Sequence, residues 1–227
     1  MSRLLPILLA LAWAFVMIRY SVWQTSRMLA AKSRPLEDPE ILRVTRALAR
    51  AQGLDHIAVY LFDIEAVNGL AAPDGRIYLT RGFYNRFRAG AVSADELASV
   101  IAHELGHVAL GHTRKRMIDV TGQNALFIAL TALFARFLPI IGIWIANAIS
   151  TALAARLSRS DEYAADEYAS ALLIKAGIGT GPQKRLFEKL EALTGGHGAA
   201  VPAWLRSHPR AADRIAAIEA HEARWNG

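Results

Sequence analysis

One nine-residue stretch constrains this chain of 227 residues more than any other, because it combines a helical composition with a metal-binding spacing. Val100 to Val108 reads V-I-A-H-E-L-G-H-V. On a helix, His103 and His107 are four residues apart and point the same way. Two imidazoles so placed can bind one Zn²⁺, and Glu104 between them can take a proton from a metal-bound water. The alternative is a surface helix whose histidines are solvated or hydrogen-bonded and bind no metal.

The residues around this motif predict a helix with one buried face. Ser93 and Glu96 have the spacing of a capping box, so we expect the helix to begin there. Apolar residues then recur at helical spacing: Leu97, Ile101, Leu105 and Val108. Gly111 suits the helix end. The two histidines fall off the apolar stripe, so we expect them on a face that is free for metal.

A second stretch, residues 158–169, is rich in charge and has helix-forming composition. Glu162 and Asp166 lie four apart in it and therefore share a face. Two histidines leave a catalytic zinc one protein ligand short, because a common set is two histidines, one glutamate and a water. Glu162 is the candidate third ligand. Asp166 can then accept a hydrogen bond from the other ring nitrogen of a ligand histidine. A solvated acidic helix face is the alternative.

Two short runs before the motif, residues 56–62 and 76–80, are rich in β-forming residues and predict a small sheet. A turn signal at 73–75 precedes the second run. We expect this sheet to have an exposed edge, and an edge strand can pair with an extended peptide through main-chain hydrogen bonds. An edge that only covers the core is the alternative.

The N-terminus is apolar from Leu4 to Ile18, and aromatic residues follow. Extended through Tyr20 and Trp23, the run approaches the about 20 residues that a spanning helix needs. We expect residues 1–34 to form an uncleaved hydrophobic anchor with a linker, and a cleaved signal peptide is the alternative. More basic residues follow the segment than precede it, which favours a cytoplasmic catalytic domain over a periplasmic one.

A second apolar region, residues 125–157, separates the histidine motif from the candidate third ligand. Arg136 and Pro139 interrupt it, so neither half comfortably reaches the length of a membrane span. Three interpretations stay open: a helical hairpin that dips into the membrane, a pair of helices that covers the active site, or two short spans. We expect residues 35–227 to form one catalytic domain with an apolar helical insertion at about 120–157.

Composition narrows the metal chemistry and the partners. The chain has no cysteine, which excludes disulfides and thiolate metal sites, so a transition metal must be held by histidine and carboxylate. The net charge of +6 suits either nucleic acid or an anionic membrane. Apart from 114–116 the basic residues are scattered, and no nucleic-acid-binding signature accompanies them. We therefore expect a membrane lipid surface as a partner, and no nucleic acid.

Four ordered motifs resemble those of the HtpX-like zinc metallopeptidases, which are related to the CAAX prenyl endopeptidases. They are A-P-D-G-R-I-Y-L-T-R-G at 72–82, H-E-L-G-H at 103–107, S-R-S-D-E-Y-A-A-D at 158–166 and S-H-P-R-A-A-D-R-I at 207–215. The resemblance covers roughly residues 36–222. It implies a gluzincin-like, mainly α fold with a small β-sheet (α+β). It also implies one Zn²⁺ per chain on His103, His107 and Glu162, with Glu104 as the catalytic base.

The same resemblance implies a substrate and a role for one more histidine. It implies that the strand formed by Ile77, Tyr78 and Leu79 lies beside the cleft and binds the substrate main chain. It also implies that His208 lies near the site, where it contacts the metal or the oxyanion. The implied activity is endopeptidase cleavage of misfolded or membrane-associated proteins, a quality-control role at a bacterial-type inner membrane. Unlike several relatives, this chain has Arg136 in the region where they carry clear transmembrane helices.

Two rival functions stand beside protease activity. One is a membrane-bound chaperone or assembly factor that uses the same fold without proteolysis. The other is a basic membrane-surface protein that binds no metal. Measuring the metal content of the purified protein separates the second rival from the other two.

Overall fold

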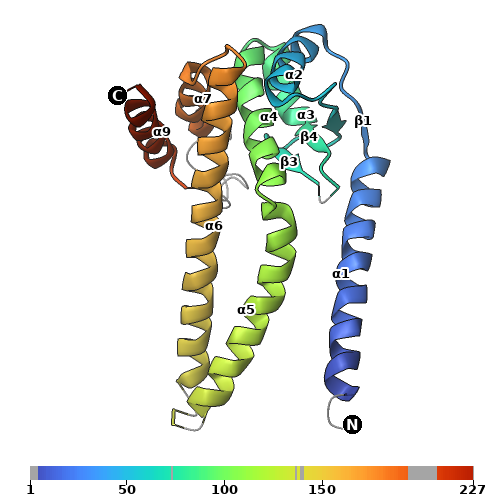
Figure 1. Cartoon of the computed structure of the whole chain (residues 1–227), viewed down its shortest axis with the longest axis vertical. Coiled ribbons are helices and arrows are strands. Elements are labelled where there is room, and N and C mark those ends of the chain that lie inside the picture. The colour runs from blue at the N-terminus through green and yellow to red at the C-terminus, as the bar shows by residue number, and fades with distance from the viewer. Residues whose placement is uncertain (1–4, 73, 136, 139–140, 194–208, 227) are drawn as a thin grey trace.

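The structure is a computed structural model that describes residues 5–72, 74–135, 137–138, 141–193 and 209–226. Its elements, in chain order, are α1 (Leu5–Ala31), β1 (Ser33–Pro35), α2 (Pro39–Gln52), β2 (Val59–Phe62), β3 (Gly69–Ala71), β4 (Ile77–Thr80), α3 (Arg81–Arg88), α4 (Ala94–Ala109), α5 (His112–Ala135), α6 (Gly142–Lys175), α7 (Gly181–Leu193) and α9 (Ala211–Asn226). In Figure 1, the sheet and the shorter helices gather in one body with one end of α6, while α1, α5 and most of α6 extend away from it. The predicted mainly helical fold with a small sheet is confirmed.

The sheet is mixed, and its strand order corrects one prediction. The order is β1-β2-β4-β3, with β2 and β4 parallel and the other two pairs antiparallel. Ile77, Tyr78 and Leu79 form β4, which lies inside the sheet with its main chain paired on both sides. The main chain of these three residues is therefore not available to a substrate, contrary to what the family resemblance implied. Gly69–Ala71 pairs outside β4, and this short strand β3 is the edge that contacts α4.

Capping hydrogen bonds mark the starts of α2 and α4, and those of α4 confirm the predicted start of the motif helix. Asp38 caps α2 by accepting the N–H of Glu40 at 3.1 Å. At α4, the Glu96 N–H donates to Ser93 Oγ at 3.2 Å, and the Ser93 N–H donates to Glu96 Oε2 at 2.8 Å. This reciprocal pair satisfies two donors that a helix start leaves unpaired, and it fixes the phase of the motif helix.

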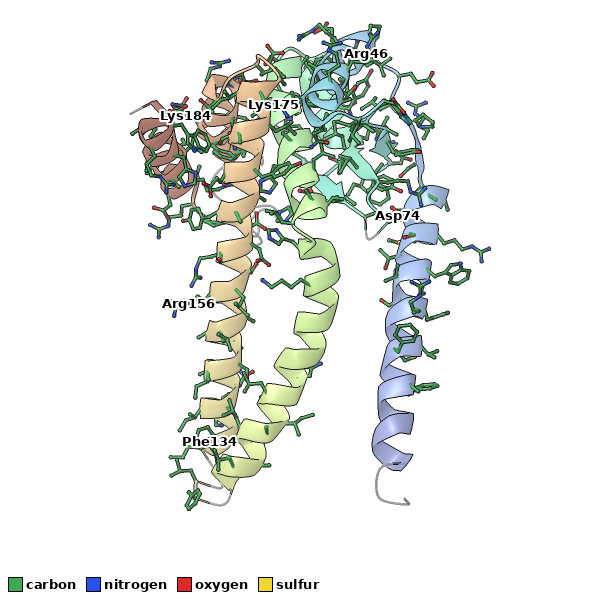
Figure 2. All side chains as sticks on the ribbon, viewed as in Figure 1. Arg46, Asp74, Phe134, Arg156, Lys175 and Lys184 are labelled. Atoms are coloured by element: carbon green, nitrogen blue, oxygen red, sulfur yellow. The ribbon has the colours of Figure 1, made fainter. Side chains whose placement is uncertain are left out.

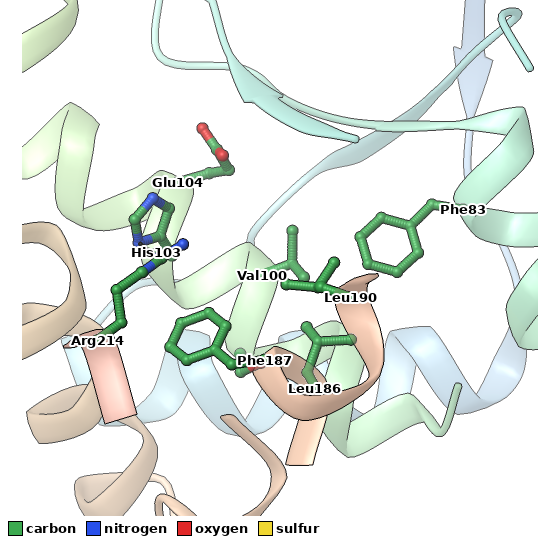
Figure 3. Close-up of a pocket in the computed structure, with 9 residues that line it drawn as sticks. Phe83, Val100, His103, Glu104, Leu186, Phe187, Leu190 and Arg214 are labelled. Carbon is green, nitrogen blue, oxygen red and sulfur yellow. Dashed lines mark hydrogen bonds between the residues drawn. The ribbon is translucent and has the colours of Figure 1, made fainter. Parts of the chain in front are cut away.

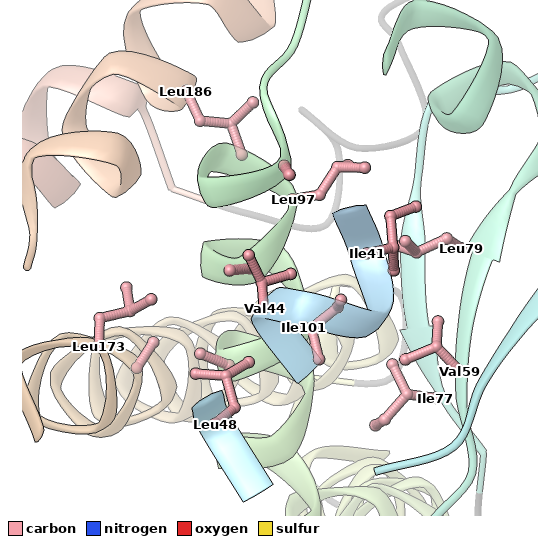
Figure 4. Packing of buried hydrophobic residues seen from close by; sticks show 14 of the residues in the cluster. Ile41, Val44, Leu48, Val59, Ile77, Leu79, Leu97, Ile101, Leu173 and Leu186 are labelled. Atoms are coloured by element: carbon pink, nitrogen blue, oxygen red, sulfur yellow. The ribbon is translucent and has the colours of Figure 1, made fainter. Parts of the chain in front are cut away.

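Helix α4 is the centre of the hydrophobic core. Its apolar residues pack against α2, the sheet and α7, and Figure 4 shows part of this cluster around α4. Fully buried members include Ile41, Val44, Leu48, Ile77, Leu79, Leu97, Ile101 and Leu173. Burying one such side chain stabilises a fold by about 1.5–3 kcal/mol, so this cluster holds α4 firmly.

Helix α6 covers the face of α4 that the sequence led us to expect as free. Gly106 makes this close approach possible, because a Cβ atom added there would lie 3.0 Å from the carbonyl oxygen of Ala165 and 3.1 Å from its Cα. As a result His103 and His107 are buried, each only 6% exposed. The histidines do lie off the apolar stripe, but they face another helix rather than solvent.

Three long helices extend from the body, and many of their large apolar side chains are exposed. In Figure 2, α1 stands apart from the α5–α6 hairpin; Phe134 lies near the tip of the hairpin and Arg156 about midway along α6. The hairpin begins beside the histidine motif and leads away from it. No helix in the described part of the chain is both long and apolar enough to cross a membrane. The N-terminal anchor and the membrane topology of the hairpin therefore stay predictions.

Candidate metal centre

Three side chains from two helices converge in the buried space between α4 and α6. His103 and His107 come from α4, and Glu162 comes from α6. The two Nε2 atoms are 3.1 Å apart. Glu162 Oε2 lies 3.3 Å from His103 Nε2, and Glu162 Oε1 lies 3.5 Å from His107 Nε2. The structure thus brings together the three residues that the sequence predicted as ligands.

These separations fit a tetrahedral zinc site. Ligand atoms about 2.0–2.1 Å from a zinc ion at tetrahedral angles lie about 3.3 Å from one another. The rings of His103 and His107 are nearly perpendicular, at 85°, so each directs its Nε2 into the shared space from a different side. Two histidines and a glutamate, all buried, are the donor set of a catalytic site that leaves a fourth position open.

Glu104 lies next to His103 in the sequence and lines a small pocket with it. Glu104 is 7% exposed. Figure 3 shows His103, Glu104 and Arg214 at one end of this pocket and apolar side chains at the other. The apolar lining consists of Phe83, Val100, Leu186, Phe187 and Leu190. A carboxylate and an apolar pocket therefore lie beside the three converging side chains.

The ring of His103 is supported by two charged residues of the core. Its Nδ1 lies 2.9 Å from Asp166 Oδ1, the contact that the sequence predicted for Asp166. Burial would lower the pKa of His103, but hydrogen bonds to Asp166 and Glu162 outweigh it and raise the pKa to about 9. When the ring is neutral and donates Nδ1–H to Asp166, the Nε2 lone pair is directed towards His107 and Glu162.

Arg214 of α9 holds Asp166 in turn. Its Nε and Nη2 donate to the two carboxylate oxygens at 2.6 and 2.5 Å. The guanidinium also lies 4.0 Å from the ring centre of Phe187. Burial would raise the pKa of Asp166, but the charge and hydrogen bonds of Arg214, with those of His103, lower it to about 2. Asp166 is therefore a charged, doubly held acceptor for His103.

The ring of His107 has a different neighbour, which the sequence analysis missed. His107 Nδ1 lies 3.0 Å from Nδ1 of His112, the first residue of α5. His112 Nε2 faces Asp161 Oδ1 at 3.6 Å, and Lys115 Nζ donates to the same oxygen at 2.8 Å. Arg214 was missed as well. The signals were present, since His112 follows the motif closely, Asp161 precedes Glu162, and Arg214 lies in the fourth motif.

The remaining predicted site residues lie elsewhere. His208 is outside the described residues, so its role stays a prediction. Tyr78 is fully buried in β4, in a cluster with Leu29 of α1, Phe62 and Ala72. Its main chain and that of its strand neighbours are already paired, so they offer no edge to a peptide.

Comparison with known proteins agrees with this geometry. The profile of Peptidase family M48 matches residues 35–222, which include every residue of the site described above. The chain belongs to this family. The resemblance predicted from the four motifs is confirmed, and the M48 chain is similar to proteases from several bacteria.

Three of these relatives show how far the similarity extends. Metalloprotease LoiP and metalloprotease YcaL of Escherichia coli are each 30% identical over 148 residues, which is 65% of this chain. The matches cover 56% and 55% of those two proteins, so this M48 chain spans about half their length. Protease HtpX of Alkalilimnicola ehrlichii is 24% identical over 254 aligned positions, covering 91% of this chain and 79% of HtpX.

Proposed function

We propose that this protein is a zinc-dependent endopeptidase. The observation that carries the proposal is the convergence of His103, His107 and Glu162 at separations that suit one tetrahedral zinc. Membership of a peptidase family supports it. Zinc held by these three side chains would polarise the scissile carbonyl and lower the pKa of the attacking water.

In this proposal Glu104 is the general base. It accepts a proton from the attacking water and passes it to the amine that leaves. It directly follows the ligand His103 on α4 and is buried, so bulk water competes little with it for the proton. The pocket beside Glu104 is lined at its far end by leucine, valine and phenylalanine, and its volume of about 20 Å³ has room for about one water-sized group.

Strand β3 is the proposed binding site for the substrate main chain. The N–H of Ala72, just after β3, donates to Arg76 O at 2.8 Å across the turn to β4. Because hydrogen-bonding groups alternate along a strand, the main-chain groups of Gly69 and Ala71 point towards the outer edge. No strand in the described residues pairs with that edge. An extended peptide can therefore add to β3 as a further strand.

Strand β3 lies close to Glu104 at Gly69. A Cβ atom added at Gly69 would lie 2.5 Å from Val100 Cγ1 and 3.6 Å from Glu104 Oε1. Only a glycine lets the strand lie this close to the motif helix. A peptide paired with β3 would therefore run past the proposed base.

The test of the catalytic assignment is Glu104→Gln in the full chain. This variant should bind one zinc per chain, as the wild type should, while cleavage of casein falls by at least about a hundredfold, since the general base is absent. Glu188→Gln, an exposed glutamate on α7, is the matched control and should cleave normally. Normal cleavage by Glu104→Gln would overturn the assignment. Retained cellular function without cleavage would favour the chaperone alternative.

We also propose that α1 and the α5–α6 hairpin associate with a lipid surface, which would give the protease access to misfolded or membrane-associated proteins. The support is a set of exposed large apolar side chains on these three helices and the hairpin tip: Trp13 at 67%, Phe15 at 65%, Ile128 at 66%, Phe137 at 69% and Trp144 at 72% exposed. Exposed apolar surface of this extent marks interaction sites, and the net charge of +6 suits anionic lipid.

Flotation with vesicles of phosphatidylethanolamine and phosphatidylglycerol tests this association. Replacing both Phe137 and Trp144 with serine at the hairpin tip should reduce the bound fraction several-fold. Trp225→Ser is the control, because Trp225 is 43% exposed but lies on α9 in the body. Equal binding of the wild type and the tip variant would contradict the proposal.

A further inference from the structure

The contact between His107 and His112 is unusual because it joins two imidazole nitrogens of the same kind. The Nδ1 atoms are 3.0 Å apart, and both side chains are buried, at 7% and 8% exposed. The rings meet at 67°, with centres 5.2 Å apart, so they are not stacked. At this distance one nitrogen must carry a proton and the other must accept it.

The converging Nε2 atoms decide which nitrogen donates. If His107 uses Nε2 towards His103 and Glu162, its proton is on Nδ1, so His107 is the donor and His112 Nδ1 the acceptor. His112 then carries its own proton on Nε2, which is the atom that faces Asp161 Oδ1 at 3.6 Å. One tautomer of each ring is thus consistent with all three contacts.

Asp161 links this arrangement to the third ligand. It directly precedes Glu162 on α6, so the carboxylate that faces His112 and the carboxylate that faces His103 are fixed by the same helical turn. Lys115, one turn into α5, donates to Asp161 Oδ1 at 2.8 Å and is itself 44% exposed. At the root of the α5–α6 hairpin, His112 of α5 therefore faces Asp161 of α6, and Lys115 of α5 holds that carboxylate in place.

We propose that His112 is a positioning residue for the metal centre: it accepts the Nδ1 proton of His107 and, with Asp161, fixes the orientation of that ring. This inference rests on the proposed zinc site but does not depend on proteolysis. Partners that hold a metal-ligating histidine by its other nitrogen typically change metal affinity by about 10–100-fold when they are removed. His112 fills that place for His107, as Asp166 does for His103.

The experiment measures zinc affinity by competition with a chelator, and the visible absorption spectrum of the Co²⁺-substituted protein, on the full chain. His112→Phe keeps an aromatic ring but cannot accept a proton. It should weaken zinc binding by about 10–100-fold and change the cobalt spectrum, because the His107 ring is free to turn. His112→Gln offers an amide oxygen to His107 and should recover most of the affinity. His56→Gln, an exposed histidine, is the matched control.

The outcomes separate this inference from the proposed function. If folded His112→Phe has an unchanged zinc affinity and an unchanged cobalt spectrum, the inference about His112 is wrong. Zinc binding by the wild type would still support the proposed metal site. A wild type that binds no zinc would overturn both. Should circular dichroism show that His112→Phe does not fold, Asp161→Asn carries the test. That variant should weaken zinc binding several-fold, and an unchanged affinity would overturn the inference.

Discussion

The two histidines of the motif are one helical turn apart, yet the structure supports them in opposite ways. His103 is held by Asp166, which Arg214 grips through both carboxylate oxygens, and all three lie deep in the body. His107 contacts a second imidazole, His112, whose own neighbour Asp161 pairs with the half-exposed Lys115 at the root of the hairpin. The residues that hold His103 form a buried ion pair in the core. The residues that hold His107 lie where the extended helices α5 and α6 join the body, next to an exposed lysine.

Because of this difference, the residues around His103 should matter most for the stability of the fold, and those around His107 for the geometry of the metal site. An ion pair inside the core cannot lose one partner without leaving a buried charge. A contact at the root of the hairpin can change without such a penalty, because Lys115 is able to turn to water. We therefore expect changes near His103 to unfold the protein, and changes near His107 to alter metal binding first.

The largest effect should come from Asp166→Asn. It leaves the Arg214 charge, 1% exposed, without its carboxylate, and should lower the free energy of unfolding by about 3–5 kcal/mol. Asp161→Asn should lower it by less than about 1 kcal/mol. Urea unfolding of the metal-free proteins measures both. If both variants lost the same free energy of unfolding, the residues that hold His103 and those that hold His107 would not differ in their contribution to stability.

A second prediction uses pH on the His103 side. Because its pKa is raised from an ordinary 6.5 to about 9, protonated His103 stabilises the metal-free fold. That contribution is complete below pH 6.5 and is lost as the pH rises through 9. Zinc binds His103 only when Nε2 carries no proton. Zinc affinity should therefore rise with pH up to about 9, by up to tenfold per pH unit. Chelator competition measured across this range would contradict the prediction if the affinity stayed constant.

The smallest effect should come from Glu222→Gln on α9, the helix that carries Arg214. Hydrogen bonds from Thr180 and Lys184 lower the pKa of Glu222, so the contact is present at neutral pH and is lost as acid protonates the carboxylate. The change should lower the free energy of unfolding by less than about 1 kcal/mol and leave zinc affinity unchanged. A clearly reduced zinc affinity would contradict this prediction and would show that Glu222 also helps to position His103 through α9.

Local patterns were sufficient to predict the helix that bears the motif and the identity of the converging side chains. Ser93 and Glu96 form the expected capping box, and Glu162 with Asp166 reaches the histidines because residues four apart share a helix face. These are short-range features, and sequence spacing determines them directly.

The features that were missed depend on contacts between distant segments. Strand β3 has three residues, one of them glycine, and forms because Gly69 fits against α4 and pairs with β4. Nothing in its composition favours a strand. Arg214 and His112 are ordinary members of their helices until α9 and α5 are placed beside the site. Burial of the histidines likewise depended on how closely Gly106 lets α6 approach.

The position of the hairpin in the chain has a consequence for the order of assembly. Both imidazoles are synthesised before α5 and α6, and Glu162 comes only after the whole of α5 and more than half of α6. A partly synthesised polypeptide therefore has no third ligand and no complete hydrolytic centre. If the centre cleaves peptide bonds as proposed, the chain gains that activity only after α5 and α6 have packed against each other.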